Sequence, residues 1–321
     1  MSKIASIVKN RFGGILYQKL RYYHQLKRLP SWPFPNCPFK HQLAAFAKLV
    51  PKAYFFSTKA IKEERRLLCK NLYKCLCELY TSKESDSLFD FNGIVLPKPI
   101  KESDEGIFAY EFLDILAPTI TGEKLFGHTV CDEGPYEMEN VQINPGDIVI
   151  DCGANLGMFA ALASYKGARV YAFEPSKYIV DQYLSKSAIR NHNIYICNIA
   201  LYDKEEQMFF ANSASNIVAG KIVKNNNKAT KPLPIQAMPL DTYVERHFLP
   251  RVDFIKADIE GAERNLLAGA KRVLKEFAPK IAICTYHLPD DAVVLRKLIH
   301  EANPKYVIIE RFKKLYAYVP K

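Results

Sequence analysis

The chain has 321 residues, which is enough for one large domain or two of ordinary size. Hydrophobic residues make up 49% and charged residues 25%, a balance that excludes global disorder and collagen-like or low-complexity architectures. Lys and Arg number 45 against 34 Asp and Glu, which gives a net charge of +11. Residues 1–80 hold 16 basic and 3 acidic side chains, so this segment carries all of the excess and residues 81–321 are close to neutral.

Residues 1–80 are predicted to form a basic helical segment, because apolar residues recur at helical spacing through most of its length. Residues 1–28 interleave basic and apolar side chains, a pattern typical of helices that lie on an anionic membrane surface. The same charge attracts nucleic acid. A third interpretation is a helical cap whose apolar stripe packs on the rest of the protein. We favour the cap, then peripheral membrane contact, and nucleic acid least.

The chain is expected to be a cytoplasmic protein that sits, at most, at the inner membrane surface. No apolar stretch approaches the ~18 residues needed to cross a bilayer. No apolar run with a small-residue cleavage site opens the chain. The eight cysteines are scattered without paired spacing, which favours reduced thiols.

Residues 81–140 are predicted to form a β-rich connector, in which residues 93–96 and 107–110 are the clearest β-like runs, followed by a loop. From residue 141 to residue 321, short apolar runs alternate with helical patterns, which is typical of a parallel sheet built from βαβ units. The expected strands are 148–150, 169–173, 194–197, 252–257 and 280–284, followed by a hairpin of 306–310 and 315–319. The expected helices are 158–164, 177–190, 261–276 and 290–302.

The strongest local signal is the glycine-rich stretch Asp151-Cys152-Gly153-Ala154-Asn155-Leu156-Gly157 between the first of these strands and its helix. Glycines there let the backbone turn sharply and approach a ligand at the carboxyl edge of the sheet. The stretch lacks the G-x-G-x-x-G dinucleotide spacing and is not a phosphate-binding P-loop. It therefore predicts a nucleotide-like cofactor without a tightly held phosphate.

Two further strand ends support a nucleoside site. Glu174 follows the second strand, where an acid can accept hydrogen bonds from two ribose hydroxyls. Asn198 and Ala200 follow the third strand, where amide groups can contact an adenine edge.

These residues, with the run Asp253-Phe254-Ile255-Lys256-Ala257-Asp258-Ile259-Glu260-Gly261-Ala262-Glu263, resemble the FkbM-type family of class I S-adenosylmethionine (SAM)-dependent methyltransferases. The resemblance covers about residues 130–321. It implies an α/β, Rossmann-like fold with a seven-stranded, mostly parallel sheet whose last strand is antiparallel, preceded here by the helical segment. It also implies SAM as the cofactor.

The resemblance further implies how residues surround SAM. Asp151, Gly153, Asn155 and Gly157 would lie around its methionine part, Glu174 with Pro175 would hold the ribose, and Asn198 and Ala200 would lie near the adenine. Tyr136, in a segment that covers the cofactor, would lie near the sulfonium, with a packing aromatic as the equal alternative.

A hydroxyl acceptor needs a base, and candidates lie after the fourth and fifth strands: Asp258, Glu260 and His287. We expect His287 to be the base, because an imidazole titrates near neutrality, with Glu260 or Asp258 orienting it or holding the substrate. The three residues can also ligate a divalent metal, an alternative that we rank lower, so no metal is expected.

The N-P-P-Y or D-P-P-Y tetrapeptide of base-amine methyltransferases is absent, which favours a hydroxyl. The resemblance implies a sugar or polyketide-like acceptor. We therefore expect O-methylation of a carbohydrate or glycosylated acceptor. The alternatives are an RNA methyltransferase that uses the basic segment, and an inactive SAM-binding scaffold.

Overall fold

The computed structural model describes residues 88–91, 93–98, 100, 108, 111, 115, 135–211, 220–223 and 232–320. They belong to a unit made of Lys83–Ile120 and Asp132–Lys321. The predicted helical segment 1–80, with its membrane contact through residues 1–28, lies outside the described residues. Among the described residues, no helix is both long and apolar enough to cross a membrane.

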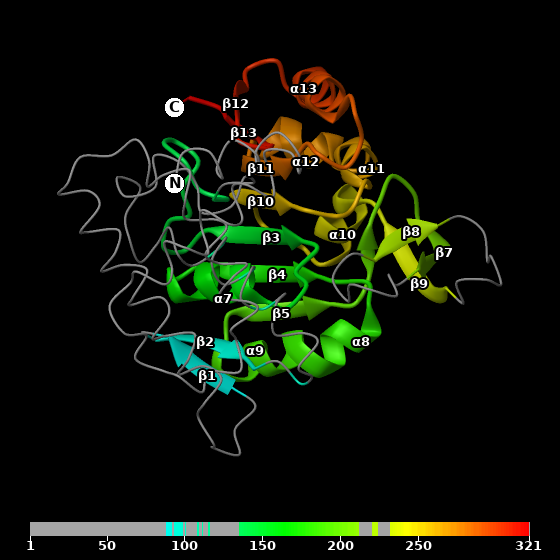
Figure 1. Ribbon diagram of the computed structural model, residues 1–321. Helices are drawn as coiled ribbons and strands as arrows, with labels where there is room; N and C mark the ends of the chain where they lie inside the picture. Colours follow the sequence, from blue (N-terminus) through cyan, green and yellow to red (C-terminus); the bar gives the residue numbers. More distant parts are fainter. Residues whose placement is uncertain are drawn as a thin grey trace, which may run out of the picture. The chain divides into compact units, whose positions relative to one another are not determined.

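One seven-stranded sheet forms the centre of the described fold. Its strands are β3 (Ile148–Cys152), β4 (Arg169–Phe173), β5 (Ile194–Cys197), β10 (Phe254–Ala257), β11 (Lys280–Cys284), β12 (Val307–Arg311) and β13 (Lys314–Tyr318). They lie in the order β12-β13-β11-β10-β3-β4-β5, which Figure 1 shows from top to bottom. The strands from β11 to β5 are parallel to one another, whereas β13 is antiparallel to both of its neighbours. This arrangement confirms the predicted α/β sheet with its antiparallel last strand.

Helices follow the strands as the sequence predicts. They are α7 (Met158–Tyr165), α8 (Lys177–Ile179), the π-helical segment η4 (Val180–Leu184), α9 (Ser185–Arg190), α10 (Leu240–Arg246), α11 (Glu263–Ala268), α12 (Lys271–Glu276) and α13 (Asp291–Ala302). Apolar residues of α10 to α13 pack on one face of the sheet, against side chains such as Ile150 and Ile255. The opposite face, which includes Val149 and Lys256, therefore points away from these four helices, because side chains alternate along a strand.

In the part of the connector that the structure describes, β1 (Leu88–Phe91) and β2 (Ile94–Pro97) form a hairpin. Strand β2 matches the β-like run predicted at 93–96. The extended run predicted at 107–110 is wrong, because Phe108 is helical and fully buried. The ring centroid of Phe108 lies 5.3 Å from that of Tyr183 on η4, so this apolar side chain packs against a helix.

A second sheet lies between β5 and β10 in the chain, and the sequence reasoning did not predict it. It contains β6 (Ala200–Leu201), β7 (Glu206–Ala211), β8 (Lys221–Val223) and β9 (Leu233–Met238). Their order is β6-β9-β7-β8, and they have a small apolar core of their own. Figure 1 shows β7, β8 and β9 on the side toward which β3, β4 and β5 point, which is the carboxyl edge of the large sheet.

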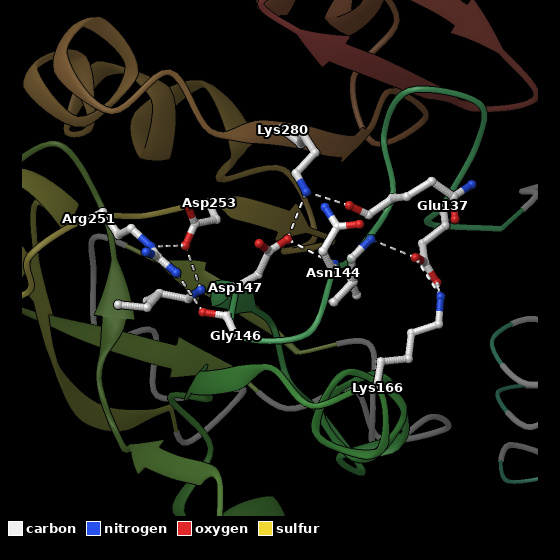
Figure 2. A network of polar contacts seen from close by, with 11 residues as sticks. Glu137, Asn144, Gly146, Asp147, Lys166, Arg251, Asp253 and Lys280 are labelled. Atoms are coloured by element: carbon white, nitrogen blue, oxygen red, sulfur yellow. Dashed lines mark hydrogen bonds and ion pairs between the residues drawn. The ribbon is translucent and has the colours of Figure 1, made fainter. Parts of the chain in front are cut away.

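Fixed ion pairs hold the opposite, amino edge of the large sheet, as Figure 2 shows. Lys280 at the start of β11 donates to Asp147 at 2.7 Å and to the carbonyl of Gln142 at 2.5 Å. Asp253 accepts the backbone N–H of Ile148 at 2.8 Å and the Arg251 guanidinium at 2.7 Å. These bonds connect the amino ends of β3, β10 and β11, so the polar residues at this edge stabilise the fold.

Candidate functional site

The glycine-rich stretch turns at the carboxyl end of β3, against the end of β10. Gly153 has a φ of 74°, and a Cβ placed on it would lie 2.1 Å from the carbonyl oxygen of Asp258. Asn155 and Gly157 also have positive φ values, of 51° and 83°. Only a residue without a side chain lets the loop lie this close to β10 at position 153. The predicted loop is thus a tight turn pressed on the neighbouring strand end.

A buried ion pair supports this loop from below. Asp151 and Lys256 are direct neighbours in the parallel pairing of β3 and β10, and Lys256 Nζ lies 3.1 Å from Asp151 Oδ1. The same ammonium donates to the carbonyl of Gly153 at 2.6 Å. Burial raises the pKa of Asp151, and Lys256 opposes that shift. Burial would lower the pKa of Lys256, but Asp151 and Asp258 outweigh it and raise the pKa.

Glu174 lies at the carboxyl end of β4 and is buried. It accepts the backbone N–H groups of Asn155 at 3.0 Å and Ser176 at 2.8 Å. Burial raises the pKa of Glu174 to about 7, although those two N–H groups oppose the shift. Glu174 therefore connects the glycine-rich loop to the end of β4, which is where the sequence places the ribose.

The remaining cofactor candidates divide into two groups. The Asn198 side chain donates to the carbonyls of Glu174 and Pro175, at 2.8 and 3.2 Å, so it fixes the turn after β4. The side chain of Ala200 packs in the core of the small sheet, which leaves only its backbone for a ligand. Neither side chain therefore points to an adenine contact of its own.

The loop region fits a SAM-type cofactor on two observations. The backbone at Gly153 lies so close to the carbonyl of Asp258 that no larger residue can form this cradle. The Oδ1 atom of Asn155 is buried and has no hydrogen-bond donor among the described residues. A buried acceptor of this kind suits the amino group of a bound methionine moiety. The residues that would hold the cofactor are thus Asp151, Gly153, Asn155 and Glu174.

Tyr136 is buried and joins the loop to the second group of candidate residues. Its hydroxyl donates to Asp258 Oδ2 at 2.6 Å, and its ring packs edge-on against Phe159 with ring centroids 5.3 Å apart. The ammonium groups of Lys314 and Lys256 lie 4.3 and 5.2 Å from its ring centroid. Tyr136 therefore packs as a core aromatic, and its hydroxyl faces Asp258, whereas its predicted place near the sulfonium stays a prediction.

Asp258, Glu260 and His287 meet at the ends of β10 and β11, as the sequence predicts. His287 Nε2 lies 3.6 Å from Asp258 Oδ1 and 3.7 Å from Glu260 Oε2. On the other side of the ring, Nδ1 lies 2.9 Å from Glu263 Oε1. The sequence reasoning had Asp258 or Glu260 orient the imidazole, and the structure instead places Glu263 at Nδ1.

Glu263 is the site residue that the sequence reasoning missed. It is fully buried, and it accepts the backbone N–H groups of Ile259 at 2.9 Å and Gly261 at 3.0 Å. Glu260 and Gly261 have φ values of 54° and 103°, so the chain turns back sharply after Asp258. The run D-I-E-G-A-E, residues 258–263, contains a signal for this contact. Its glycine permits the turn that brings Glu263 back beneath Asp258.

The charges of this cluster shift one another's pKa values. Burial would lower the pKa of His287, but Glu263, Asp258 and Glu260 outweigh it and raise the pKa. Burial raises the pKa of Glu260, which His287 opposes. Burial would also raise the pKa of Asp258, yet Lys256 and the Tyr136 hydroxyl lower it below its usual value. Of the two carboxyl groups that face Nε2, Asp258 therefore has the stronger preference for the ionised form. The surrounding carboxylates favour the protonated form of the imidazole.

The two groups of residues lie on one edge of the sheet and share Asp258. Its backbone N–H donates to the carbonyl of Cys152 at 3.2 Å, and the Tyr286 hydroxyl donates to its Oδ1 at 3.2 Å. A cofactor cradle and an acid–histidine cluster therefore adjoin, which is the arrangement that group transfer from a bound cofactor requires.

Comparisons with known proteins agree with this geometry. The domain family described as "Methyltransferase FkbM domain" matches residues 151–310. The hexuronic acid methyltransferase AglP of Haloferax volcanii is 27% identical over 157 residues, which are 49% of this chain and 63% of that protein. The 31-O-demethyl-FK506 methyltransferase FkbM of Streptomyces tacrolimicus is 46% identical over 43 residues, which are 13% of this chain and 16% of that protein.

Two solved structures are similar to this chain. Methyltransferase FkbM from Methylobacillus flagellatus KT has a TM-score of 0.44 and 20% identity, covering 68% of this chain and 55% of that one. Fibrillarin from Aeropyrum pernix, solved with bound SAM, has a TM-score of 0.40 and 12% identity, covering 75% of this chain and 86% of that one. The chain covers less than two thirds of the length of each of the two curated relatives, AglP and the FK506 methyltransferase.

The matched residues include the glycine-rich loop, Glu174 and the acid–histidine cluster, and the sheet is the seven-stranded, mostly parallel one with an antiparallel last strand that the resemblance implies. Residues 151–310 of the chain belong to the FkbM family of SAM-dependent methyltransferases.

Proposed function

We propose that this protein transfers a methyl group from SAM to a hydroxyl oxygen of a carbohydrate or a glycosylated acceptor. One observation carries the proposal: the acid–histidine cluster of Asp258, Glu260 and His287 lies beside the glycine-rich loop, with Gly153 packed on the carbonyl of Asp258. Family membership and the 27% identity to a hexuronic acid methyltransferase support the choice of acceptor.

The chemistry explains why such a cluster is useful. The acceptor oxygen attacks the methyl carbon in line with the carbon–sulfur bond, so the C–S bond breaks as the O–C bond forms. Alignment is the main requirement. A neutral hydroxyl also loses its proton, and a basic group within reach accelerates that loss. Asp258, Glu260 and His287 are the described groups at this edge that can accept it.

The Tyr286 side chain extends the site toward solvent. Its ring centroid lies 4.2 Å from that of His287, its exposed fraction is 37%, and the exposed Lys313 lies 5.4 Å from the ring. Leu288, two residues further along the chain, is also exposed. Such a rim of exposed apolar side chains supports an acceptor of which only one end enters the site.

The test is a methyl-transfer assay with radiolabelled SAM. The purified full chain is offered oligosaccharides that contain uronic acid, neutral oligosaccharides and RNA, each in a separate reaction. The proposal predicts label in the oligosaccharides that survives mild alkali, because methyl ethers resist alkali and methyl esters do not. Label in RNA would support the RNA methyltransferase instead. SAM binding without transfer to any acceptor would support the scaffold.

A further inference from the structure

The acid–histidine cluster has a geometry that proton transfer within the cluster does not explain. His287 has only 4% of its side chain exposed, and its Nε2 has no hydrogen-bond partner among the described residues. Nε2 faces Asp258 and Glu260 at 3.6 and 3.7 Å, which is too long for hydrogen bonds. A buried imidazole nitrogen aimed at two carboxylates without bonding to them calls for a third participant.

The separations suit two ligands that share one metal ion. If Nε2 and a carboxylate oxygen each lie about 2.1 to 2.3 Å from an ion, separations of this size correspond to an angle at the ion of roughly 105 to 125°. These angles are wider than those of the near-ideal octahedron that Mg²⁺ demands. One imidazole and two carboxylates form a mixed donor set that suits a first-row divalent ion such as Mn²⁺ or Zn²⁺.

Glu263 completes the pattern on the far side of the ring. A histidine that ligates a metal through one nitrogen usually donates from the other to a carboxylate, which fixes the tautomer. Glu263 Oε1 lies 2.9 Å from Nδ1, and the backbone N–H groups of Ile259 and Gly261 hold its carboxylate in place. A ligand atom of Glu263 also lies within 4.8 Å of ligand atoms of Asp258 and His287.

The charge balance favours a cation as well. Three carboxylates surround one imidazole here: Asp258, Glu260 and Glu263. Two buried ammonium groups act on Asp258, but Lys256 is also paired with Asp151, and Lys314 also lies over the ring of Tyr136. Asp258 Oδ1 accepts one hydroxyl, from Tyr286, and a carboxylate oxygen keeps a second lone pair for another partner.

We propose that His287 Nε2, Asp258 and Glu260 form a binding site for one divalent cation of the Mn²⁺ type, with Glu263 as the residue that positions His287. This deepens the proposed function, on which its catalytic meaning rests. A bound cation lowers the pKa of a hydroxyl that it coordinates. His287 is then a ligand and not the base, and the hydroxyl proton passes to water.

The experiment measures Mn²⁺ binding without SAM or acceptor, so its outcome is independent of methyl transfer. The full chain is freed of metal with a chelator and titrated with MnCl₂, and free Mn²⁺ is followed by electron paramagnetic resonance. We expect one saturable site per chain. Glu260→Gln and His287→Ala remove a ligand each, and Glu263→Gln removes the positioning carboxylate, so each weakens binding by about tenfold or more.

Glu301→Gln is the matched control. Glu301 is exposed and lies in the last turn of α13, a helix that begins after His287 and runs back toward the amino edge. Its substitution leaves Mn²⁺ binding unchanged. Glu260 is outside the core, so Glu260→Gln keeps the test valid if His287→Ala fails to fold. Absence of saturable Mn²⁺ binding by the unmodified chain, or equal binding by Glu260→Gln, overturns the site and leaves the methyltransferase proposal untouched.

Discussion

Lys256 Nζ lies 3.1 Å from Asp151 Oδ1 on neighbouring strands, and both side chains are almost completely buried. The pair is the foundation of the cofactor loop, because the same ammonium donates to the carbonyl of Gly153. Breaking a buried pair by removing one partner leaves an uncompensated charge, which is far costlier than losing a surface ion pair.

Lys256→Met is therefore expected to lower the free energy of unfolding by about 3 to 5 kcal/mol, because Asp151 stays buried without its counter-charge. SAM affinity is expected to fall as well, since the loop loses its bond at Gly153. Chemical denaturation and calorimetry measure the two effects. The double variant Lys256→Met with Asp151→Asn should recover part of the stability but not the affinity, and additive losses would contradict the pairing.

Gly153→Ala is expected to abolish SAM binding. The new Cβ would lie 2.1 Å from the carbonyl of Asp258, and φ at this position is 74°. The loop must then move away from β10. Gly146→Ala is the matched control, because its φ of 84° is similar but nothing lies within 4 Å of the added Cβ. The control carries only the conformational cost of about 1 to 2 kcal/mol. SAM binding by both variants would show that the cradle is not used.

SAM affinity is expected to depend on pH through Glu174. Burial raises the pKa of Glu174 to about 7, so the carboxylate is ionised at pH 8 and mostly protonated at pH 6. A protonated acid accepts ribose hydroxyls less well, so affinity should fall by about tenfold between these pH values. Calorimetry at both pH values tests this. Glu174→Gln cannot ionise, so its weak binding should lack this drop, and a similar drop in the variant would assign the effect to another group.

His287→Ala is expected to lower turnover much more than SAM affinity, because His287 faces Asp258 and Glu260 and not the glycine-rich loop. Glu263→Gln should lower turnover in the same direction through the orientation of the ring. Steady-state kinetics with the labelled acceptor gives the turnover number, and calorimetry gives the affinity. Unchanged turnover in His287→Ala would remove this residue from the mechanism, whether as base or as ligand.

Lys280→Met should affect stability alone. Lys280 and Asp147 are mostly buried at the amino edge, with side-chain exposures of 19% and 12%, so the loss leaves Asp147 without its partner (Figure 2). We expect the free energy of unfolding to fall by about 2 to 3 kcal/mol. Urea denaturation measures this change. SAM affinity should stay the same, because the cofactor loop is at the other edge, and a parallel loss of affinity would contradict that separation.

The sequence predicted the large sheet and the position of the site because both depend on strong local patterns. Strands such as residues 169–173 and 280–284 are short apolar runs, and the loop from Asp151 to Gly157 is rich in glycine. Polar residues that directly follow such strands must gather at one edge of a parallel sheet. Asp258 and His287 were found in this way.

The contacts that sequence reasoning missed depend on longer-range geometry. Lysine is usually exposed, so nothing local indicated that Lys256 and Lys314 are buried. Glu263 was read as part of a family motif and not as a partner of His287, because the contact depends on two positive φ angles after Asp258. The small sheet was missed because β6 and β8 have only two and three residues and because a proline interrupts the longer strand β9.

Gly269 fixes the small sheet at its base. A Cβ on Gly269 would lie 2.1 Å from the carbonyl of Tyr202, which follows β6, and 3.1 Å from Cα of Pro239, which follows β9. The carboxyl ends of these two strands therefore meet at Gly269, between α11 and α12. A small sheet that is fixed at one end can vary in length and sequence at its other end without disturbing the large sheet to which it is attached. Substitutions at the far ends of β7 and β8 are therefore expected to leave the glycine-rich loop and the acid–histidine cluster in place.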